Sequence, residues 1–166
     1  MATKTLLSAE EYLRTSFEGQ EPDYIEGELL ERPVPNFFHS RIQTRLSYAF
    51  KPWEDRQQLF CAPEIRLRVA PDRFRIADFA LFSSERNEPI PERAPYAIVE
   101  IVSPDDRYEE IMSKLADYEE AGVEFLFVAD PPAHKLSRYR HGDLYAVAAL
   151  ELAEYEVVIP PDAIFG

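Results

Sequence analysis

Two nearly continuous apolar runs restrict most strongly what this chain can fold into. Residues 74–82 (FRIADFALF) and 96–102 (YAIVEIV) hold few polar side chains. Strands of this kind are typical of central positions in a sheet that is covered on both faces. We therefore expect an α/β domain whose mixed central β-sheet is flanked by helices.

Each of the two apolar runs contains one carboxylate. In an extended strand Asp78 shares a face with Ile76 and Ala80, and Glu100 shares a face with Ile98. Carboxylates are almost never fully buried without a partner or a metal ion. If the two strands pair, the carboxylates repel each other, and a divalent metal ion between them would keep both ionised.

The remaining sequence predicts the elements around these strands. The Ser8-x-x-Glu11 spacing is typical of a helix capping box, Pro52 is expected to end a helix, and Asp105 or Asp106 is expected to cap another. Turn residues at 71–72 and 141–143 predict two hairpins. We expect helices over residues 8–17, 38–50 and 108–121, and strands over 24–31 (bulged or divided in two), 64–69, 124–129, 134–140 and 144–147.

Length and composition predict a single domain over residues 1–166, with a helical lead-in at 1–20 and a C-terminal extension at 148–166. The longest uncharged apolar stretches, 125–129 and 144–150, fall short of the roughly 18 to 20 residues that cross a bilayer. The first residues lack the apolar run of a signal peptide, so we expect a cytoplasmic protein without a membrane partner. Cys61 is the only cysteine, which excludes an internal disulfide and a thiolate metal cluster.

The charge is unevenly distributed along this acidic chain. The net charge is -13, yet residues 35–76 hold eight basic and four acidic side chains. Arg41 and Arg45 lie one helical turn apart, and four arginines crowd the hairpin over residues 64–75. These side chains could form a positive strip along a nucleic-acid backbone, or they could be ordinary solvated charges.

Lys114 interrupts the apolar face of the predicted helix over 108–121. Ile111, Lys114 and Tyr118 recur at steps of three and four residues, so the lysine lies on or beside the face toward the sheet. Lys114 could extend its ammonium to solvent along the sheet, or it could lie near Asp78 and Glu100. In the second case the group offers two hard oxygen ligands and a cation, which suits Mg²⁺ better than zinc.

Several motifs in this order resemble the PD-(D/E)XK nuclease superfamily, and within it the Uma-type family of restriction-endonuclease-like bacterial proteins. The resemblance covers roughly residues 6–145. The matching segments are DYIEGELL at 23–30, Pro33-x-Pro35 with His39, Ala77-Asp78, IVEIVSP at 98–104, KLADYEEAGVEF at 114–125 and VADP at 128–131.

The resemblance implies a restriction-endonuclease-like core and a role for each matched residue. Asp78, Glu100 and the main-chain carbonyl of Ile101 would bind Mg²⁺ or Mn²⁺. Lys114 would replace the lysine that the superfamily places two residues after the glutamate, where this chain has Val102. Glu28 would add an acidic group from the early strand, or it faces solvent.

Four further side chains are candidates for the same site. His39 would touch a phosphate or a water, or it only caps or covers a helix start. Arg41 and Arg45 are candidate contacts to the nucleic-acid backbone. Glu64, at the start of an alternating strand, could face the cleft.

The implied activity is metal-dependent hydrolysis of phosphodiester bonds in nucleic acid, with DNA as the expected substrate. The alternative is a non-catalytic binding or oligomerisation module on the nuclease scaffold, which the acidic charge and the absence of a recognition motif favour. The presence of Asp78, Glu100 and Lys114 together in apolar surroundings favours the enzyme. The apolar residues at 157–159 and Phe165 could add a strand or cover a homodimer surface.

Overall fold

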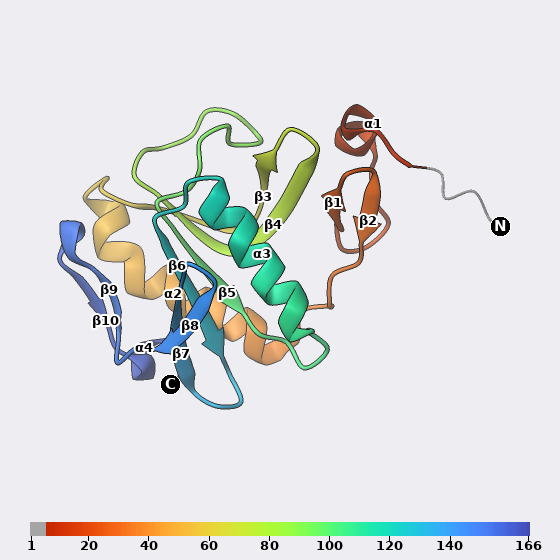
Figure 1. The fold of residues 1–166 in the computed structure, drawn as a ribbon. Coiled ribbons are helices and arrows are strands. Elements are labelled where there is room, and N and C mark those ends of the chain that lie inside the picture. Colours follow the sequence, from red (N-terminus) through yellow and green to blue (C-terminus); the bar gives the residue numbers. More distant parts are fainter. Residues whose placement is uncertain (1–5) are drawn as a thin grey trace.

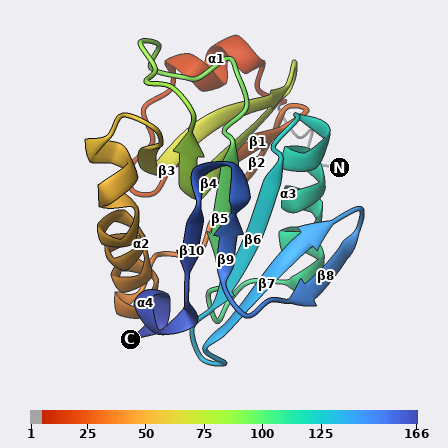
Figure 2. The same cartoon turned by 90° about the vertical axis from the view of Figure 1, so that its left-hand side faces the viewer.

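Helices cover both faces of a central eight-stranded sheet in the computed structural model, which describes residues 6–166 (Figures 1 and 2). The strand order is β2-β1-β4-β5-β6-β7-β8, and β3 pairs with β4 outside this path. Only β5 and β6 pair in parallel among these strands, so the sheet is mixed, as predicted.

The strands are β1 (Asp23–Ile25), β2 (Glu28–Leu30), β3 (Phe60–Ala70), β4 (Arg73–Phe82), β5 (Ala97–Ile101), β6 (Phe125–Asp130), β7 (Lys135–Arg140) and β8 (Asp143–Ala146), with β9 (Leu150–Leu152) and β10 (Val157–Ile159) in a second sheet. The helices are α1 (Ala9–Arg14), α2 (Phe37–Asp55), α3 (Tyr108–Glu120) and α4 (Pro161–Phe165). None of the helices over residues 6–166 combines the length and the apolar character that a membrane span requires.

The two apolar runs are neighbouring central strands. β4 and β5 pair antiparallel, with Ala80 opposite Ile98. Asp78 lies two residues before Ala80 and Glu100 two residues after Ile98, so both carboxylates occupy the same face of the sheet. The buried residues of that face pack against α3, which contributes Leu115 to the same hydrophobic cluster. The strand pairing on which the sequence argument depended is therefore present.

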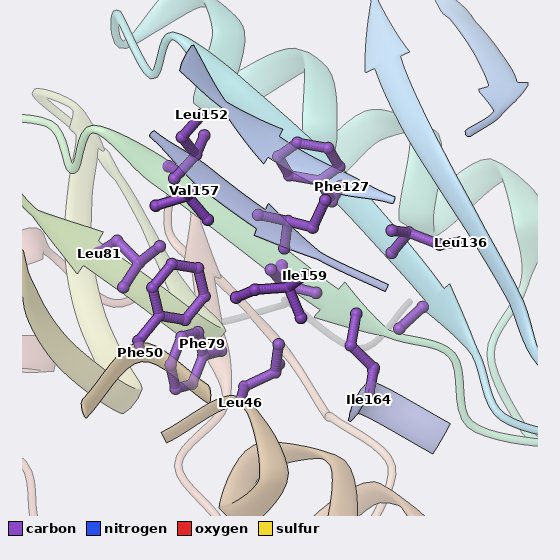
Figure 3. Close-up of a cluster of buried hydrophobic side chains, with 14 of the residues drawn as sticks. Leu46, Phe50, Phe79, Leu81, Phe127, Leu136, Leu152, Val157, Ile159 and Ile164 are labelled. Atoms are coloured by element: carbon purple, nitrogen blue, oxygen red, sulfur yellow. The ribbon is translucent and has the colours of Figure 1, made fainter. Parts of the chain in front are cut away.

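The opposite face of the sheet packs against α2 and the C-terminal segment (Figure 3). Phe50 of α2 stacks on Phe79 of β4. Val157, Ile159 and the other inward-facing residues of the tail are buried in the same cluster. The tail therefore adds a hairpin of its own that completes the core of this chain.

Two helix boundaries differ from the sequence prediction. Pro52 lies inside α2, which continues to Asp55, so the prediction that this proline ends the helix is wrong. The last turn of α2 is stabilised by the C-terminal segment, because the Trp53 Nε1–H donates to the Tyr155 carbonyl at 2.8 Å. The lead-in helix α1 has the predicted capping box but ends at Arg14, since Thr15 takes an extended conformation.

The start of α3 also differs from the prediction. Its N-cap is Arg107, and neither Asp105 nor Asp106 caps it. The Asp106 carboxylate instead accepts a hydrogen bond from the Ser103 N–H at 2.7 Å. This bond tightens the connection between β5 and α3 and brings the first turn of α3 close to the end of β5.

Candidate active site

A cavity of about 380 Å³ opens where β1, the segment after β2, the strands β4 and β5, and the first half of α3 meet. Asp78, Glu100, Ile101, Lys114 and His39 all line it. The structure thus brings together five of the residues singled out from the sequence. The other lining residues are Gln20, Asp23, Ile25, Leu29, Leu30, Glu31, Arg32, Pro33, Arg75, Val102, Ser103, Asp106, Glu109, Glu110, Ile111 and Ser113.

Lys114 points toward the carboxylates and away from solvent. Its Nζ lies 2.7 Å from Glu100 Oε2, and its side chain is only 13% exposed. Tyr118, one helical turn further along α3, donates its hydroxyl to Glu100 Oε1 at 3.0 Å. Both oxygens of Glu100 are therefore held by neighbouring residues on one helix. Lys114 therefore does not extend its ammonium to solvent along the sheet.

Asp78 accepts hydrogen bonds from three different segments. The Ile101 N–H donates to Oδ2 at 2.8 Å, His39 Nε2 lies 3.3 Å from the same oxygen, and Arg32 Nη2 lies 3.2 Å from Oδ1. The Gln43 side chain also donates to the main-chain carbonyl of Asp78 at 2.9 Å. The position of this carboxylate is thus fixed by β5, by α2 and by the segment after β2.

The two buried carboxylates differ in their electrostatic surroundings. Burial and repulsion from Asp78 raise the pKa of Glu100 to about 8. Burial alone would also raise the pKa of Asp78, but Lys114, His39 and the Ile101 N–H together hold it well below its usual range. The pair therefore favours less than two full negative charges near neutral pH. Additional positive charge beside it would let both groups ionise.

His39 is buried at the start of α2 and faces this pair. Asn36 accepts the His39 N–H through its side chain at 3.0 Å and caps the helix. Burial by itself lowers the pKa of the His39 imidazole, yet the Asp78 carboxylate outweighs it and raises the pKa above its ordinary value. His39 therefore acts as a donor to Asp78 and is not a surface residue.

Arg32 is a charged residue of the site that the sequence did not indicate. Its side chain is 9% exposed and its Nη2 lies 2.9 Å from Glu64 Oε2 as well as 3.2 Å from Asp78 Oδ1. Its Nε lies 4.0 Å from Asp23 Oδ1. Arg32 lies in a short polar segment between Glu31 and Pro33. This segment has no hydrophobic periodicity that would distinguish a buried position from an exposed one.

Glu64 joins the site through Arg32 and Gln43. The Gln43 Nε2 donates to Glu64 Oε1 at 2.8 Å. In the β3–β4 register Glu64 is opposite Asp78, because Pro63 faces Phe79 and Ile65 faces Ala77. Glu64 has a left-handed backbone with φ of 50°. Its side chain, on an exposed residue, forms the outer edge of the charged group.

The hairpin arginines do not form a free positive strip. Arg75 is buried, with its Nε 2.7 Å from Asp117 Oδ2 and its Nη1 3.1 Å from Asp23 Oδ2. Arg73 pairs with Asp117 and Glu26. Carboxylates from β1, the β1–β2 turn and α3 therefore neutralise Arg73 and Arg75, whereas the exposed Arg68 donates to the Pro71 carbonyl at 2.7 Å. Arg66 likewise pairs with Glu21.

Four candidate residues lie outside the cavity lining, one of which is Glu64 at the edge of the charged group. Glu28 is on β2, whereas the acidic residues that this part of the chain contributes to the cavity are Asp23 and Glu31. Arg41 is exposed on α2, and the Arg45 guanidinium lies close to Gly166 at the chain end. The two arginines therefore lie on α2 beyond His39, away from the two carboxylates.

The fold has a counterpart among solved structures. The chain matches a solved structure described as "a putative nuclease belonging to DUF820 from Anabaena variabilis ATCC 29413", with a TM-score of 0.84 and 20% sequence identity. The match covers 96% of this chain and 97% of the other. At this identity the likeness concerns the fold, a mixed α/β architecture with a central mixed sheet.

The family follows from the sequence itself. Residues 9–165 match the model of the Uma2 family, described as "Putative restriction endonuclease", so the chain belongs to this family. The resemblance drawn from the motifs is confirmed. A comparison with curated proteins gives no match.

Proposed function

We propose that this protein is a metal-dependent endonuclease that hydrolyses phosphodiester bonds in DNA. The observation that carries the proposal is the meeting of Asp78 and Glu100, from paired strands, with Lys114 in one cavity. Two carboxylates and a lysine supply ligands for a divalent cation and a donor for the reacting water. Membership of the Uma2 family supports the same class of reaction.

The donor set fits a hard divalent cation. Asp78 and Glu100 would hold Mg²⁺ or Mn²⁺ through carboxylate oxygens, and the main-chain carbonyl of Ile101 would be a further ligand. The fit is supported by the buried carboxylates, which repel each other and raise the pKa of Glu100. When bound, such an ion polarises a phosphoryl oxygen and lowers the pKa of a bound water.

The protein side chains would then orient the reaction. Lys114 would donate a hydrogen bond to the attacking water and stabilise the negative charge that develops on the phosphorus oxygens. The Tyr118 hydroxyl would keep Glu100 oriented, since it already donates to one carboxylate oxygen. His39 and the Ile101 N–H would do the same for Asp78.

The acidic surroundings of the cavity disfavour nonspecific binding of nucleic acid. Glu31, Asp106, Glu109 and Glu110 line it, and a strongly acidic surface repels phosphates. Affinity for nucleic acid would therefore come from contacts made within the candidate active site. Homodimerisation stays a prediction, and light scattering of the purified protein tests it directly.

Calorimetric titration with Mg²⁺ and Mn²⁺, together with cleavage of mixed DNA substrates, tests the proposal. Asp78→Asn and Glu100→Gln should lose both metal binding and cleavage. Asp55→Asn, a charge-matched change at an exposed pair with Lys51, should keep both. Metal or DNA binding by the wild type without any cleavage would favour the non-catalytic module, and no metal binding even with DNA present would contradict the proposal.

A further inference from the structure

A second group of metal-ligating atoms adjoins the Asp78–Glu100 pair. His39, Glu64 and Asp78 each offer one ligand atom, and these atoms lie within 4.8 Å of one another. They come from α2, β3 and β4. One imidazole nitrogen with two carboxylate oxygens is a donor set that favours a transition ion such as Mn²⁺ over Mg²⁺.

This His39–Glu64–Asp78 group already holds a cation that belongs to the chain. The Arg32 Nη2 bridges Glu64 Oε2 at 2.9 Å and Asp78 Oδ1 at 3.2 Å, so it contacts two of the three members. A guanidinium stays charged at every physiological pH. Because the Arg32 side chain is 9% exposed, its charge is poorly screened by water.

The neighbours of Arg32 keep it in this position. Gln43 donates to Glu64 Oε1 at 2.8 Å and turns the other oxygen of that carboxylate toward the guanidinium. Asp23 lies on the far side, with its Oδ1 4.0 Å from Arg32 Nε. His39 Nδ1 is buried and makes no hydrogen bond with the rest of residues 6–166, so that ring nitrogen is not fixed by the chain.

We infer that Arg32 is a tethered cation that replaces a second metal ion at the His39–Glu64–Asp78 group. A divalent ion and a guanidinium within the same few ångströms repel each other strongly. The wild-type protein therefore binds one divalent ion, at Asp78 and Glu100, and the second position opens only when Arg32 is removed. The single-ion part rests on the proposed function, whereas the occupation of the second position by Arg32 does not.

Calorimetric stoichiometry with MnCl₂ and MgCl₂ tests this inference without any measurement of cleavage. Wild type should bind one Mn²⁺, Arg32→Met should bind two, and Arg32→Met with Glu64→Gln should return to one. Each of these three proteins should bind one Mg²⁺, because the second position contains an imidazole. Arg32→Lys keeps a cation in place and should also bind one Mn²⁺.

The outcomes separate this inference from the nuclease proposal. Two Mn²⁺ ions in wild type, or one in a folded Arg32→Met, would overturn the inference and leave the nuclease proposal standing. No ion in wild type, but one in Arg32→Met that Glu64→Gln removes, would support the inference and contradict the Asp78–Glu100 site. If Arg32→Met does not fold, as judged by circular dichroism, Arg32→Gln carries the same expectations, and one Mn²⁺ in a folded Arg32→Gln would overturn the inference.

Discussion

The ammonium of Lys114 on α3 lies 2.7 Å from the carboxylate of Glu100 on β5, although fourteen residues separate them in the chain. The β5–α3–β6 crossover produces this pairing, because α3 packs back over the face of the sheet that carries Glu100. The helix therefore places a cation beside Glu100, whereas the residue two positions after Glu100, just beyond the end of β5, is the apolar Val102.

Lys114→Met should reduce DNA cleavage by about 100-fold or more, because it removes the group that we propose as the donor to the water and to the developing charge. Single-turnover cleavage rates at saturating Mg²⁺ measure this effect. The matched control is Lys51→Met, which removes an exposed lysine paired with Asp55 on α2. Equal rates for wild type and Lys114→Met would exclude the proposed role.

Asp117→Asn should lower the free energy of unfolding by about 3 kcal/mol, because removal of one partner from a buried ion pair leaves the other charge less well compensated. The affected group is Arg75, which is 4% exposed and 2.7 Å from Asp117, and which would keep only Asp23 as a carboxylate partner. Urea unfolding followed by circular dichroism gives the value. Asp55→Asn is the exposed control and should leave the midpoint unchanged, whereas an equal loss in both variants would contradict the prediction.

Phe50→Ala should cost about 3 to 5 kcal/mol of stability, since it opens a cavity in the core. Phe50 is fully buried between α2 and the sheet, where it stacks on Phe79 (Figure 3). Tyr48→Ala, two residues earlier on the same helix, removes a side chain that is 74% exposed and should have little effect. Thermal unfolding of both variants distinguishes packing from helix propensity.

The central sheet was predictable because its signals are local. Strict alternation and apolar runs indicate which residues of a strand are buried, so the β3–β4 hairpin followed from the sequence. The shared face of Asp78 and Glu100 was an expectation that depended on the pairing of their strands, which the structure shows. Lys114 could be identified as a candidate because a lysine interrupts the apolar face of its helix. The same reasoning found the buried carboxylates, since a charge inside an apolar run is rare.

The parts that sequence reasoning missed depend on contacts between distant segments. Arg32 and Glu64 are 32 residues apart in the chain, and nothing near Arg32 indicates that it is nearly buried. The charge of Arg75 was visible, but its neutralisation by Asp23 and Asp117 requires the folded arrangement of β1, β4 and α3. α2 continues through Pro52 for a similar reason, because its last turn is packed and bonded from the C-terminal segment.

Cys61 should react with iodoacetamide far more slowly in the native protein than in urea. Burial, with a further contribution from Glu54, raises the pKa of its thiol to about 12, and the thiolate is the reactive form. At pH 8 the native thiolate fraction is then about one in ten thousand, so the rate should rise about tenfold per pH unit up to pH 10 without a plateau. Glu54→Gln should accelerate the reaction, because it removes the negative charge that opposes ionisation. Alkylation rates measured by mass spectrometry from pH 7 to 10 decide the matter, and a plateau near pH 9, as in a free thiol, would show that Cys61 is not shielded.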